Sequence, residues 1–506
     1  MHLKSILRNL DYTEIKGSLE VDVTSIAFDS REATMNGVFV AISGFTVDGH
    51  NYIEKAIKNG ASVIIVERDI WFEDPVTIIK VSDTRLALAR ISANFYENPT
   101  EKLNLIGITG TNGKTSTTYF VKSIFEQAKK SIGLIGTMGT IINNRHFETK
   151  NTTPESLHLQ ETFSKMVDEG IEDCIMEVSS HALDLNRVAD SNFNTAIFTN
   201  LTPDHLELHK NMEEYFNAKA KLFDLAQDHV VINVDDPYGR RLLEKVKDSG
   251  KSITTYGINQ EADIYPTDLH FYADYSTFQL NTPTGTAEIK VNIPGVIFVY
   301  NSLAAIASAY INQISLEDIQ EGIDAVKGIK GRLEVIYQDK SRKVVVDFAH
   351  TEDGLEKALS TLRPYTKGRL IVVFGVYAAP GKDGSEKRRA MGKVAATYAD
   401  LSIVTSDNPK EQDPNLIVKE IIESMNEVDG KYHVEIDRKE AIKYALDNSQ
   451  DGDVILLAGK GHETAQVIGN EEIPFNEKEI VHELLENKRK NKLKLQTTRK
   501  FIKLKR

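Results

Sequence analysis

The sequence has 506 residues but only one cysteine, one tryptophan and no long uninterrupted apolar run. With Cys174 alone, no intrachain disulfide can form, which fits a reducing cytosol. We expect Cys174 to be a buried structural thiol in a core strand. A membrane-spanning helix needs about 20 consecutive apolar residues, and the sequence contains no such stretch. The first residues carry scattered charges and lack the apolar centre of a signal peptide, so a cytoplasmic protein is expected.

Positive charge is also in deficit. The chain has 61 Lys and Arg against 74 Asp and Glu, a formal net charge of −13. An acidic body disfavours nucleic acid as a partner, because phosphates require a basic face. The exception is 487–506, with ten Lys or Arg and no acid. Such a tail is usually solvated and disordered. Its interleaved apolar residues leave open a peripheral contact with an anionic membrane, which attracts polybasic segments.

The composition that remains is that of an ordinary globular protein, with 41% hydrophobic and 27% charged residues. At roughly 100–200 residues per domain, the length predicts about three domains. Alternating apolar runs and helical stretches predict an α/β fold with parallel sheets. We place a small α/β domain at 1–98, a central domain at 99–330, a Rossmann-like domain at 331–486 and the basic tail at 487–506.

Buried strands are predicted from apolar runs bounded by turn residues. In parallel sheets, ligands sit beyond the carboxyl ends of strands, so 407–410 and 459–463 are expected to be functional loops. The composition changes at 263–293, where aromatic residues lie among Thr, Asp and Pro, and this predicts an antiparallel insert. A helix over 301–313 is expected to follow it. The predicted strands are 61–66, 76–81, 103–109, 174–178, 196–199, 230–233, 343–348, 369–374, 401–405 and 454–458.

A phosphate-binding loop, Gly110-Thr111-Asn112-Gly113-Lys114-Thr115, joins the strand at 103–109 to a helix that begins at Lys114. The first N–H groups of a helix are unpaired and favour anions. Lys114 would reach the β- and γ-phosphates of a nucleotide, and Thr115 would ligate Mg²⁺. Ile108 occupies a position where the longer loop template has glycine, so this is a shortened variant.

Candidate metal ligands follow two later strands. Glu177 ends one of them, where a carboxylate could support Mg²⁺ or simply face solvent. The loop 200–209 carries two histidines and two acids, and could equally be a polar loop that caps a helix. Lys219 lies on a predicted helix over 212–223, and local spacing alone favours a solvated lysine there.

Together these segments resemble the Mur ligase family of ATP-dependent amino-acid ligases, and within it the MurE type, which adds the third residue of the peptidoglycan stem peptide. The resemblance runs from about residue 20 to 486 and is specific because the motifs occur in order. They are 28–31, 110–115, 151–154, 176–181, 200–205, 218–219, 300–301, 331–334, 347–350, 407–409 and 459–463.

The resemblance implies a role for each domain and for individual residues. The first domain would hold the UDP end of a UDP-N-acetylmuramoyl dipeptide, the central domain ATP, and the third domain the incoming amino acid. The implied ATP-binding residues are Gly110, Thr111, Asn112, Gly113, Lys114, Thr115, Ser116, Asn301 and Arg332. Catalysis would involve Lys114, Lys219 as a carbamate, His205, Asp347 and His350, and Mg²⁺ would be held by Thr115, Glu177, His205 and Lys219. The implied UDP-substrate residues are Ser30, Thr46, Asn151, Thr152, Thr153, Ser179 and Arg187, and the amino-acid residues are Lys382, Asp407, Asn408, Lys410, Gly459 and Glu463.

The resemblance further implies a monomeric cytoplasmic enzyme of cell-wall synthesis that uses ATP and Mg²⁺ and proceeds through an acyl phosphate. Three positions depart from the family pattern: Phe298 replaces an asparagine, Glu352 a proline, and Lys410 an arginine. Lysine binds a carboxylate as a point charge, whereas arginine uses a rigid fork. Gly459 and Glu463 keep the pattern of the diaminopimelate-adding type, so diaminopimelate is favoured, with lysine or another diamino acid next. The alternatives are a folylpolyglutamate synthase-like ligase and a noncatalytic nucleotide-dependent binding protein that uses the basic tail as a contact surface.

Overall fold

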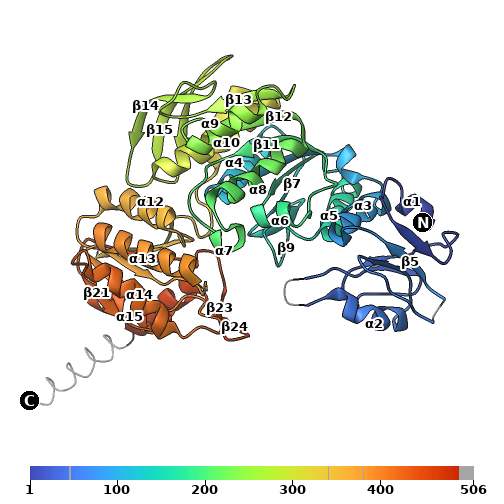
Figure 1. The fold of residues 1–506 in the computed structure, drawn as a ribbon. Helices are drawn as coiled ribbons and strands as arrows, with labels where there is room; N and C mark the ends of the chain where they lie inside the picture. The colour runs from blue at the N-terminus through green and yellow to red at the C-terminus, as the bar shows by residue number, and fades with distance from the viewer. Residues whose placement is uncertain (45–46, 74, 340, 380, 489, 491–506) are drawn as a thin grey trace, which may run out of the picture.

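The protein is described by a computed structural model that covers residues 1–490, with the exception of 45–46, 74, 340, 380 and 489. We refer to 1–98, 99–330 and 331–490 as the N-terminal, central and C-terminal lobes, after the five-stranded, eight-stranded and six-stranded sheets that they contain. Figure 1 shows the first and last of these on either side of the central lobe. The α/β fold with parallel sheets, predicted from the sequence, is confirmed.

The N-terminal lobe contains a five-stranded sheet in the order β1-β5-β4-β3-β2, in which only β1 runs antiparallel to its neighbour. The strand β4 has an almost wholly buried apolar sequence, because a parallel sheet is covered on both faces. The elements are α1 Leu3–Ile6, β1 Glu14–Lys16, β2 Ile26–Ala27, β3 Gly37–Val40, η1 Gly49–Tyr52, α2 Ile53–Lys58, β4 Ala61–Val66, β5 Thr77–Lys80 and α3 Thr84–Phe95.

The central lobe is built on an eight-stranded sheet in the order β13-β12-β11-β6-β10-β7-β8-β9. The strands from β13 to β7 are parallel, and the hairpin of β8 and β9 closes one edge in antiparallel pairing. The strands are β6 Asn104–Thr109, β7 Ile132–Gly136, β8 Gly139–Ile142, β9 Arg145–Phe147, β10 Asp173–Glu177, β11 Phe193–Phe198, β12 Ala226–Asn233 and β13 Ser252–Tyr256.

Helices cover both faces of this sheet, so the sheet separates two hydrophobic clusters. Phe120 and Ile124 pack on one face, and Phe163 and Phe223 on the other. Cys174 of β10 is buried in the second of these clusters, as expected. The helices are η2 Pro99–Lys102, α4 Lys114–Gln127, α5 Ser156–Asp168, α6 Ser180–Asp184, α7 Leu206–His209, α8 Met212–Leu225, α9 Pro237–Val246, α10 Val296–Ile311 and α11 Leu316–Ala325.

The predicted antiparallel insert is present as a three-stranded sheet, β14 Tyr265–Phe271, β15 Ser276–Thr282 and β16 Gly285–Val291. Alternate residues such as Phe278, Leu280 and Ile289 turn into the core shared with α10 and α11, as the period of two in a strand requires. The insert therefore braces the helices that stand behind the phosphate loop.

The C-terminal lobe has a six-stranded sheet in the order β17-β18-β22-β19-β20-β21, parallel except for β17 at one edge, and a separate hairpin of β23 and β24. The carboxyl ends of β18, β20 and β22 lie at the same edge, where the sequence predicted functional loops. The elements are β17 Glu334–Gln338, β18 Arg342–Asp347, α12 Glu352–Leu362, η3 Arg363–Tyr365, β19 Leu370–Phe374, α13 Gly381–Tyr398, β20 Leu401–Val404, α14 Pro414–Asn426, β21 Tyr432–Val434, α15 Arg438–Asn448, β22 Asp453–Ala458, β23 Ala465–Ile468 and β24 Glu471–Pro474.

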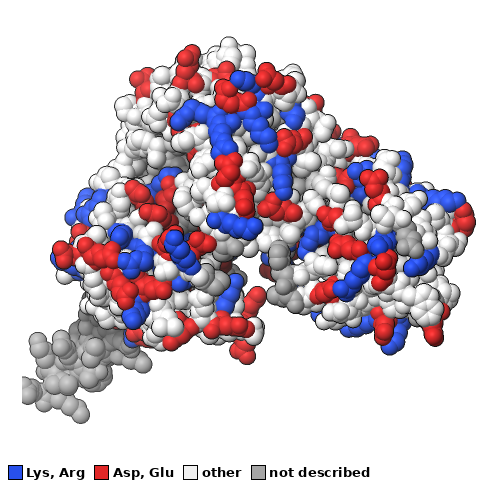
Figure 2. Space-filling view, in the orientation of Figure 1, with Lys and Arg blue, Asp and Glu red and all other residues white. Residues whose placement is uncertain are grey.

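Within the described residues, every helix is too short or too polar to cross a bilayer. Acidic and basic side chains are interspersed on the face seen in Figure 2, which is hollowed between the N-terminal and C-terminal lobes. Of the basic tail, 489 and 491–506 lie outside the described residues, so its membrane contact stays a prediction.

Candidate active site

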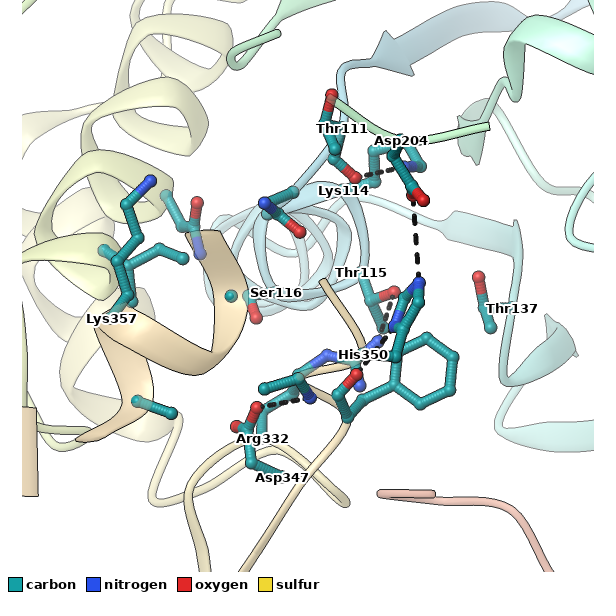
Figure 3. Close-up of a pocket in the computed structure, with 18 of the residues that line it drawn as sticks. Thr111, Lys114, Thr115, Ser116, Thr137, Asp204, Arg332, Asp347, His350 and Lys357 are labelled. Atoms are coloured by element: carbon teal, nitrogen blue, oxygen red, sulfur yellow. Dashed lines mark hydrogen bonds and ion pairs between the residues drawn. The ribbon is translucent and has the colours of Figure 1, made fainter. Parts of the chain in front are cut away.

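A cavity of about 290 Å³ lies where the central and C-terminal lobes meet. The phosphate loop forms one wall, and residues that follow β18 form the opposite wall (Figure 3). Most of the side chains that the resemblance implied for ATP and catalysis line this one cavity. They are Thr111, Asn112, Gly113, Lys114, Thr115, Ser116, Glu177, His205, Asn301, Arg332, Asp347 and His350.

The phosphate loop has the local structure that an anion site needs. Gly113 lies at φ +91° directly before α4, a conformation that favours glycine, and a Cβ there would displace the Asn301 side chain, whose Oδ1 would be 2.3 Å away. The Lys114 ammonium donates to the carbonyls of Gly110 and Thr111, at 2.8 and 3.0 Å. Burial lowers the pKa of Lys114, and the carboxylates of Glu177 and Asp204 oppose that shift. The lysine is thus held among oxygens at the helix N-terminus, where phosphates bind.

Glu177 faces the phosphate loop and is 1% exposed, which contradicts the solvent-facing alternative. Its Oε1 accepts from Thr115 Oγ1 at 3.0 Å and from the Thr137 N–H at 3.0 Å. Arg332, from the start of the C-terminal lobe, donates to the same Thr115 hydroxyl at 3.1 Å and lies over the Phe348 ring. A carboxylate, a hydroxyl and a guanidinium therefore converge at the phosphate end of the cavity.

Two of the four implied metal ligands, Thr115 and Glu177, meet directly, and His205 lines the same cavity. Within the described part of the chain, no cluster of three or more His, Cys, Asp or Glu could by itself hold a metal ion. Mg²⁺ in nucleotide sites is usually held by one or two protein oxygens together with substrate phosphates and water. The buried oxygen pair of Thr115 and Glu177 fits that mode of binding.

Lys219 lies on α8 behind the phosphate loop and is 2% exposed, so it is not the solvated lysine that local spacing alone favoured. The tertiary fold overrides local spacing, because α8 packs this face against β6 and β11. Its ammonium donates to the Gly110 carbonyl at 2.9 Å and sits 4.6 Å from the centre of the Tyr215 ring. Burial, together with the charge of Lys114, lowers the pKa of Lys219 far below its usual value.

A charged cluster that the sequence did not predict joins the two lobes beside this cavity. Asp204, which precedes α7, accepts from Lys387 of α13 at 2.9 Å, and its second oxygen lies 3.3 Å from His205 and 3.8 Å from His350. Figure 3 shows Asp204 and His350 facing one another. Burial alone would raise the pKa of Asp204, but the neighbouring His205, Lys387 and His350 outweigh it and hold that pKa well below its usual range. Lys387 also donates to Tyr377 at 2.9 Å.

The opposite wall is set by Asp347 and His350, at the carboxyl end of β18. Asp347 accepts from the backbone N–H groups of Leu333 and Ala349, at 2.7 and 2.8 Å, and burial raises its pKa although Arg332 opposes this. Burial lowers the pKa of His350 to about 4, so its imidazole is neutral at pH 7. The two backbone hydrogen bonds that Asp347 accepts hold the turn that carries His350.

The residues implied for the UDP substrate form a path from the N-terminal lobe to this cavity. Ser30 lines a cavity of about 560 Å³ in the N-terminal lobe, and Asn151 lines a neighbouring one of about 660 Å³. Thr152 and Ser179 line the cavity of about 290 Å³ itself. Thr46 lies outside the described residues.

Ion pairs of Arg187 and Arg85 with Glu155 connect the N-terminal and central lobes along this path. Arg187 pairs with Glu155 at 2.8 Å and donates to the Thr153 carbonyl at 3.0 Å. Arg85 of the N-terminal lobe lies 3.4 Å from the same Glu155 oxygen. No sequence motif marks Arg85, and only the packing of the two lobes brings it here.

The residues implied for the amino acid meet beyond the ends of β20 and β22. Asn408 donates to Glu463 at 3.3 Å, and the wholly buried Lys460 donates to both, at 3.1 and 2.8 Å. The backbone N–H of Lys410 donates to the carbonyl of Val467, on β23.

Lys382 does not join this group, because it falls in the first turn of α13. Its side chain is 87% exposed, and it pairs with Glu386 one turn along the same helix.

Comparison with known protein families gives three matches in order along the chain: the Mur ligase family catalytic domain over 22–96, the Mur ligase middle domain over 108–309, and the Mur ligase glutamate ligase domain over 331–461. The UDP-N-acetylmuramoyl-L-alanyl-D-glutamate–2,6-diaminopimelate ligase of Clostridium perfringens is 44% identical over 96% of this chain and 100% of its own length. The protein of the same name from Caldanaerobacter subterraneus subsp. tengcongensis is 46% identical over 96% and 99%.

Solved structures agree with these matches. A ligase described by the same name superimposes with a TM-score of 0.68 at 28% identity, and covers 97% of this chain and 99% of its own. The folylpolyglutamate synthase of Mycobacterium tuberculosis, at 17% identity over 74% of this chain and a TM-score of 0.61, shares the fold alone. Because three consecutive domain matches and relatives above 40% identity span nearly the whole chain, this protein belongs to the Mur ligase family.

Proposed function

We propose that the protein is an ATP-dependent ligase that joins a diamino acid, with diaminopimelate favoured, to UDP-N-acetylmuramoyl-L-alanyl-D-glutamate. The observation that carries the proposal is the cavity between lobes, in which Lys114 and Glu177 face Asp347 and His350. Thr152 and Ser179 line one side of it, and the loop that carries Glu463 packs through His462 on Phe348 of its opposite wall. Relatives that match over 96% of this chain and at least 99% of their own length, at 40–46% identity, carry the name of that ligase.

Amide formation needs activation of the carboxylate, which ATP supplies. A carboxylate oxygen of the D-glutamyl side chain attacks the γ-phosphorus, the bond to the β-phosphate oxygen breaks, and an acyl phosphate and ADP result. Lys114 and Arg332 neutralise charge on the transferring phosphoryl group. The amine then attacks the acyl carbon, phosphate leaves with its bridging oxygen, and a proton is lost from nitrogen. Closure of the two lobes keeps water away from the acyl phosphate.

Magnesium belongs to this proposal as the ion that Thr115 and Glu177 would hold, with His205 nearby. When bound, Mg²⁺ neutralises phosphate charge and orients the β- and γ-phosphates. Burial lowers the pKa of Lys219, which favours the neutral amine, the form that reacts with CO₂. Carbamylated Lys219 would add an anionic oxygen behind the phosphate loop.

The choice of amino acid rests on Asn408, Lys410 and Glu463. The distal end of diaminopimelate carries a carboxylate, which would pair with Lys410, and an ammonium, which would pair with Glu463. The distal end of lysine carries only the ammonium. We therefore expect diaminopimelate to be preferred over L-lysine even though Lys410 replaces the family's arginine.

A panel experiment tests the proposal. Purified protein, ATP, Mg²⁺ and UDP-N-acetylmuramoyl-L-alanyl-D-glutamate are incubated with diaminopimelate, L-lysine, L-ornithine or D-lysine, and the product is identified by mass spectrometry. We expect the tripeptide product with diaminopimelate. Glutamate addition to a folate substrate would favour the folylpolyglutamate-type alternative. ATP binding without product from any pair of substrates would favour the noncatalytic one.

A further inference from the structure

Beneath the two amino-acid-binding loops, 407–410 and 459–463, lies a buried arginine that no motif singled out. Arg438 is the first residue of α15, in the lower part of the C-terminal lobe in Figure 1, and its side chain is 0% exposed. Burying a guanidinium is costly unless its donors are used and its charge is paired. The partners of Arg438 therefore indicate what its position does for the fold.

Those partners come from three distant segments. The Arg438 Nε donates to Glu477 Oε1 at 2.9 Å, and one terminal nitrogen donates to the carbonyl of Ala458, the last residue of β22, at 2.8 Å. The other terminal nitrogen lies 3.8 Å from Asp407 Oδ2. The three nitrogens of a guanidinium approach three separate groups in a fixed plane, whereas an ammonium has a single nitrogen. Arg438 thus ties the start of one loop to the start of the other, with Glu477 as the counter-charge.

The Asp407 carboxylate lies toward this arginine. Its side chain is 8% exposed, and its Oδ2 lies 2.7 Å from where a Cβ on Gly459 would be. Gly459 is at φ +114°, so glycine is required there for both conformation and space. Asp407 and Gly459 form the contact between the two loops, and Arg438 holds that contact from below.

The residues proposed to contact the amino acid directly follow Asp407 and Gly459 in the sequence. Asn408 directly follows Asp407, and the buried Lys460 directly follows Gly459 and orients both Asn408 and Glu463. A shift of either loop would separate Asn408 from Glu463. The 459–463 loop also packs on Phe348 of the nucleotide cavity, through His462 at 5.0 Å between ring centres.

We propose that Arg438 is the positioning residue that holds the two amino-acid-binding loops in register, so that the incoming amine is presented correctly to the acyl carbon. The inference rests on the proposed function. Arg438 does not touch the amino acid and acts through Asp407 and the Ala458 carbonyl.

The test uses full-length protein and three variants. R438M/E477M removes both members of the buried pair, because replacing a whole buried pair by apolar residues is often neutral for stability, whereas removing one partner is not. R438K keeps a charge for Glu477 but supplies a single nitrogen. R369M is the matched control, since Arg369 pairs with buried Asp453 at 2.8 Å at the opposite end of the same strands.

The readouts are the thermal unfolding midpoint and separate KM values for diaminopimelate, ATP and the UDP-dipeptide. Loss of the charge-assisted hydrogen bond to Ala458 and of the ion pair with Asp407 predicts a rise of roughly 10- to 100-fold in the KM for diaminopimelate in R438M/E477M, with the other two KM values within about twofold. In R438K we expect the KM for diaminopimelate to rise by at least about fivefold. R369M should lower the unfolding midpoint without changing that KM.

An unchanged KM for diaminopimelate in R438K or in R438M/E477M overturns the proposal, as does an equal rise in R369M. If the double variant does not fold, R438K alone decides. Wild-type protein that ligates none of the four amino acids refutes the proposed function instead, before any variant is compared.

Discussion

The ion pair between Lys387 and Asp204 is the contact through which closure of the C-terminal lobe can be tested most sharply. Its members come from different lobes, lie 2.9 Å apart, and have side chains only 14% and 4% exposed. Removing one member of a buried pair costs about 3–5 kcal/mol when the other is left unpaired. His205 remains 3.3 Å from Asp204, which reduces the expected cost to about 2–3 kcal/mol.

Because the pair joins two lobes, its loss should destabilise the closed arrangement of the central and C-terminal lobes more than the fold of either lobe. K387M should therefore lower kcat/KM for ligation by roughly 30- to 150-fold, the equivalent of about 2–3 kcal/mol. Small-angle scattering with ATP and the UDP-dipeptide should show a larger radius of gyration than in wild type. K393M is the matched control on the same helix, since Lys393 pairs with Glu427 on the surface of one lobe. Exposed pairs contribute about 0–1 kcal/mol, so K393M should stay within about threefold of wild type.

The double variant D204N/K387M should lose less than the sum of the two single losses, because the partners act together. Equal kcat/KM values in K387M and K393M would refute the reasoning, as would strict additivity in the double variant.

Further predictions concern single residues of the site. K114A should abolish ligation by removing the charge at the phosphate end, and near-wild-type turnover in a coupled ADP assay would contradict the mechanism. G459A should lower the free energy of unfolding by about 1–3 kcal/mol in urea, through strain at φ +114° and the clash with Asp407, and an unchanged midpoint would show that the loop adapts. Stability should fall as pH drops from 6.5 towards 4, since unfolded protein takes up a proton that buried His350, with a pKa of about 4, does not. H350Q should remove at most about 3 kcal/mol of that fall, and an identical pH slope in H350Q would assign it to other groups.

The strands and the phosphate loop were predictable because they depend on local pattern. The apolar run before Gly110 became β6, and the helix that begins at Lys114 became α4, since buried parallel strands are apolar throughout and the glycine-rich turn leaves little choice of backbone. The position of Glu177 at the end of β10 follows from the same rule. Family resemblance added the roles of residues such as Lys219, which spacing alone would have left solvated.

Contacts between distant segments were not predictable in this way. Lys382 and Lys387 are five residues apart in one basic stretch, and only the packing of α13 decides that the first faces solvent and the second meets Asp204. Arg438 carries no motif, and its partners Asp407, Ala458 and Glu477 lie 20 to 39 residues away. Such residues become visible only when burial and partners are known.

Transfer of oxygen from the substrate carboxylate to phosphate tests the central claim most directly. The UDP-dipeptide is labelled with ¹⁸O in the D-glutamyl side-chain carboxylate and converted with ATP and diaminopimelate, and the released phosphate is analysed by mass spectrometry. Activation as an acyl phosphate predicts one ¹⁸O atom in phosphate for each amide bond formed. Phosphate free of ¹⁸O, together with full formation of the amide, would contradict the account.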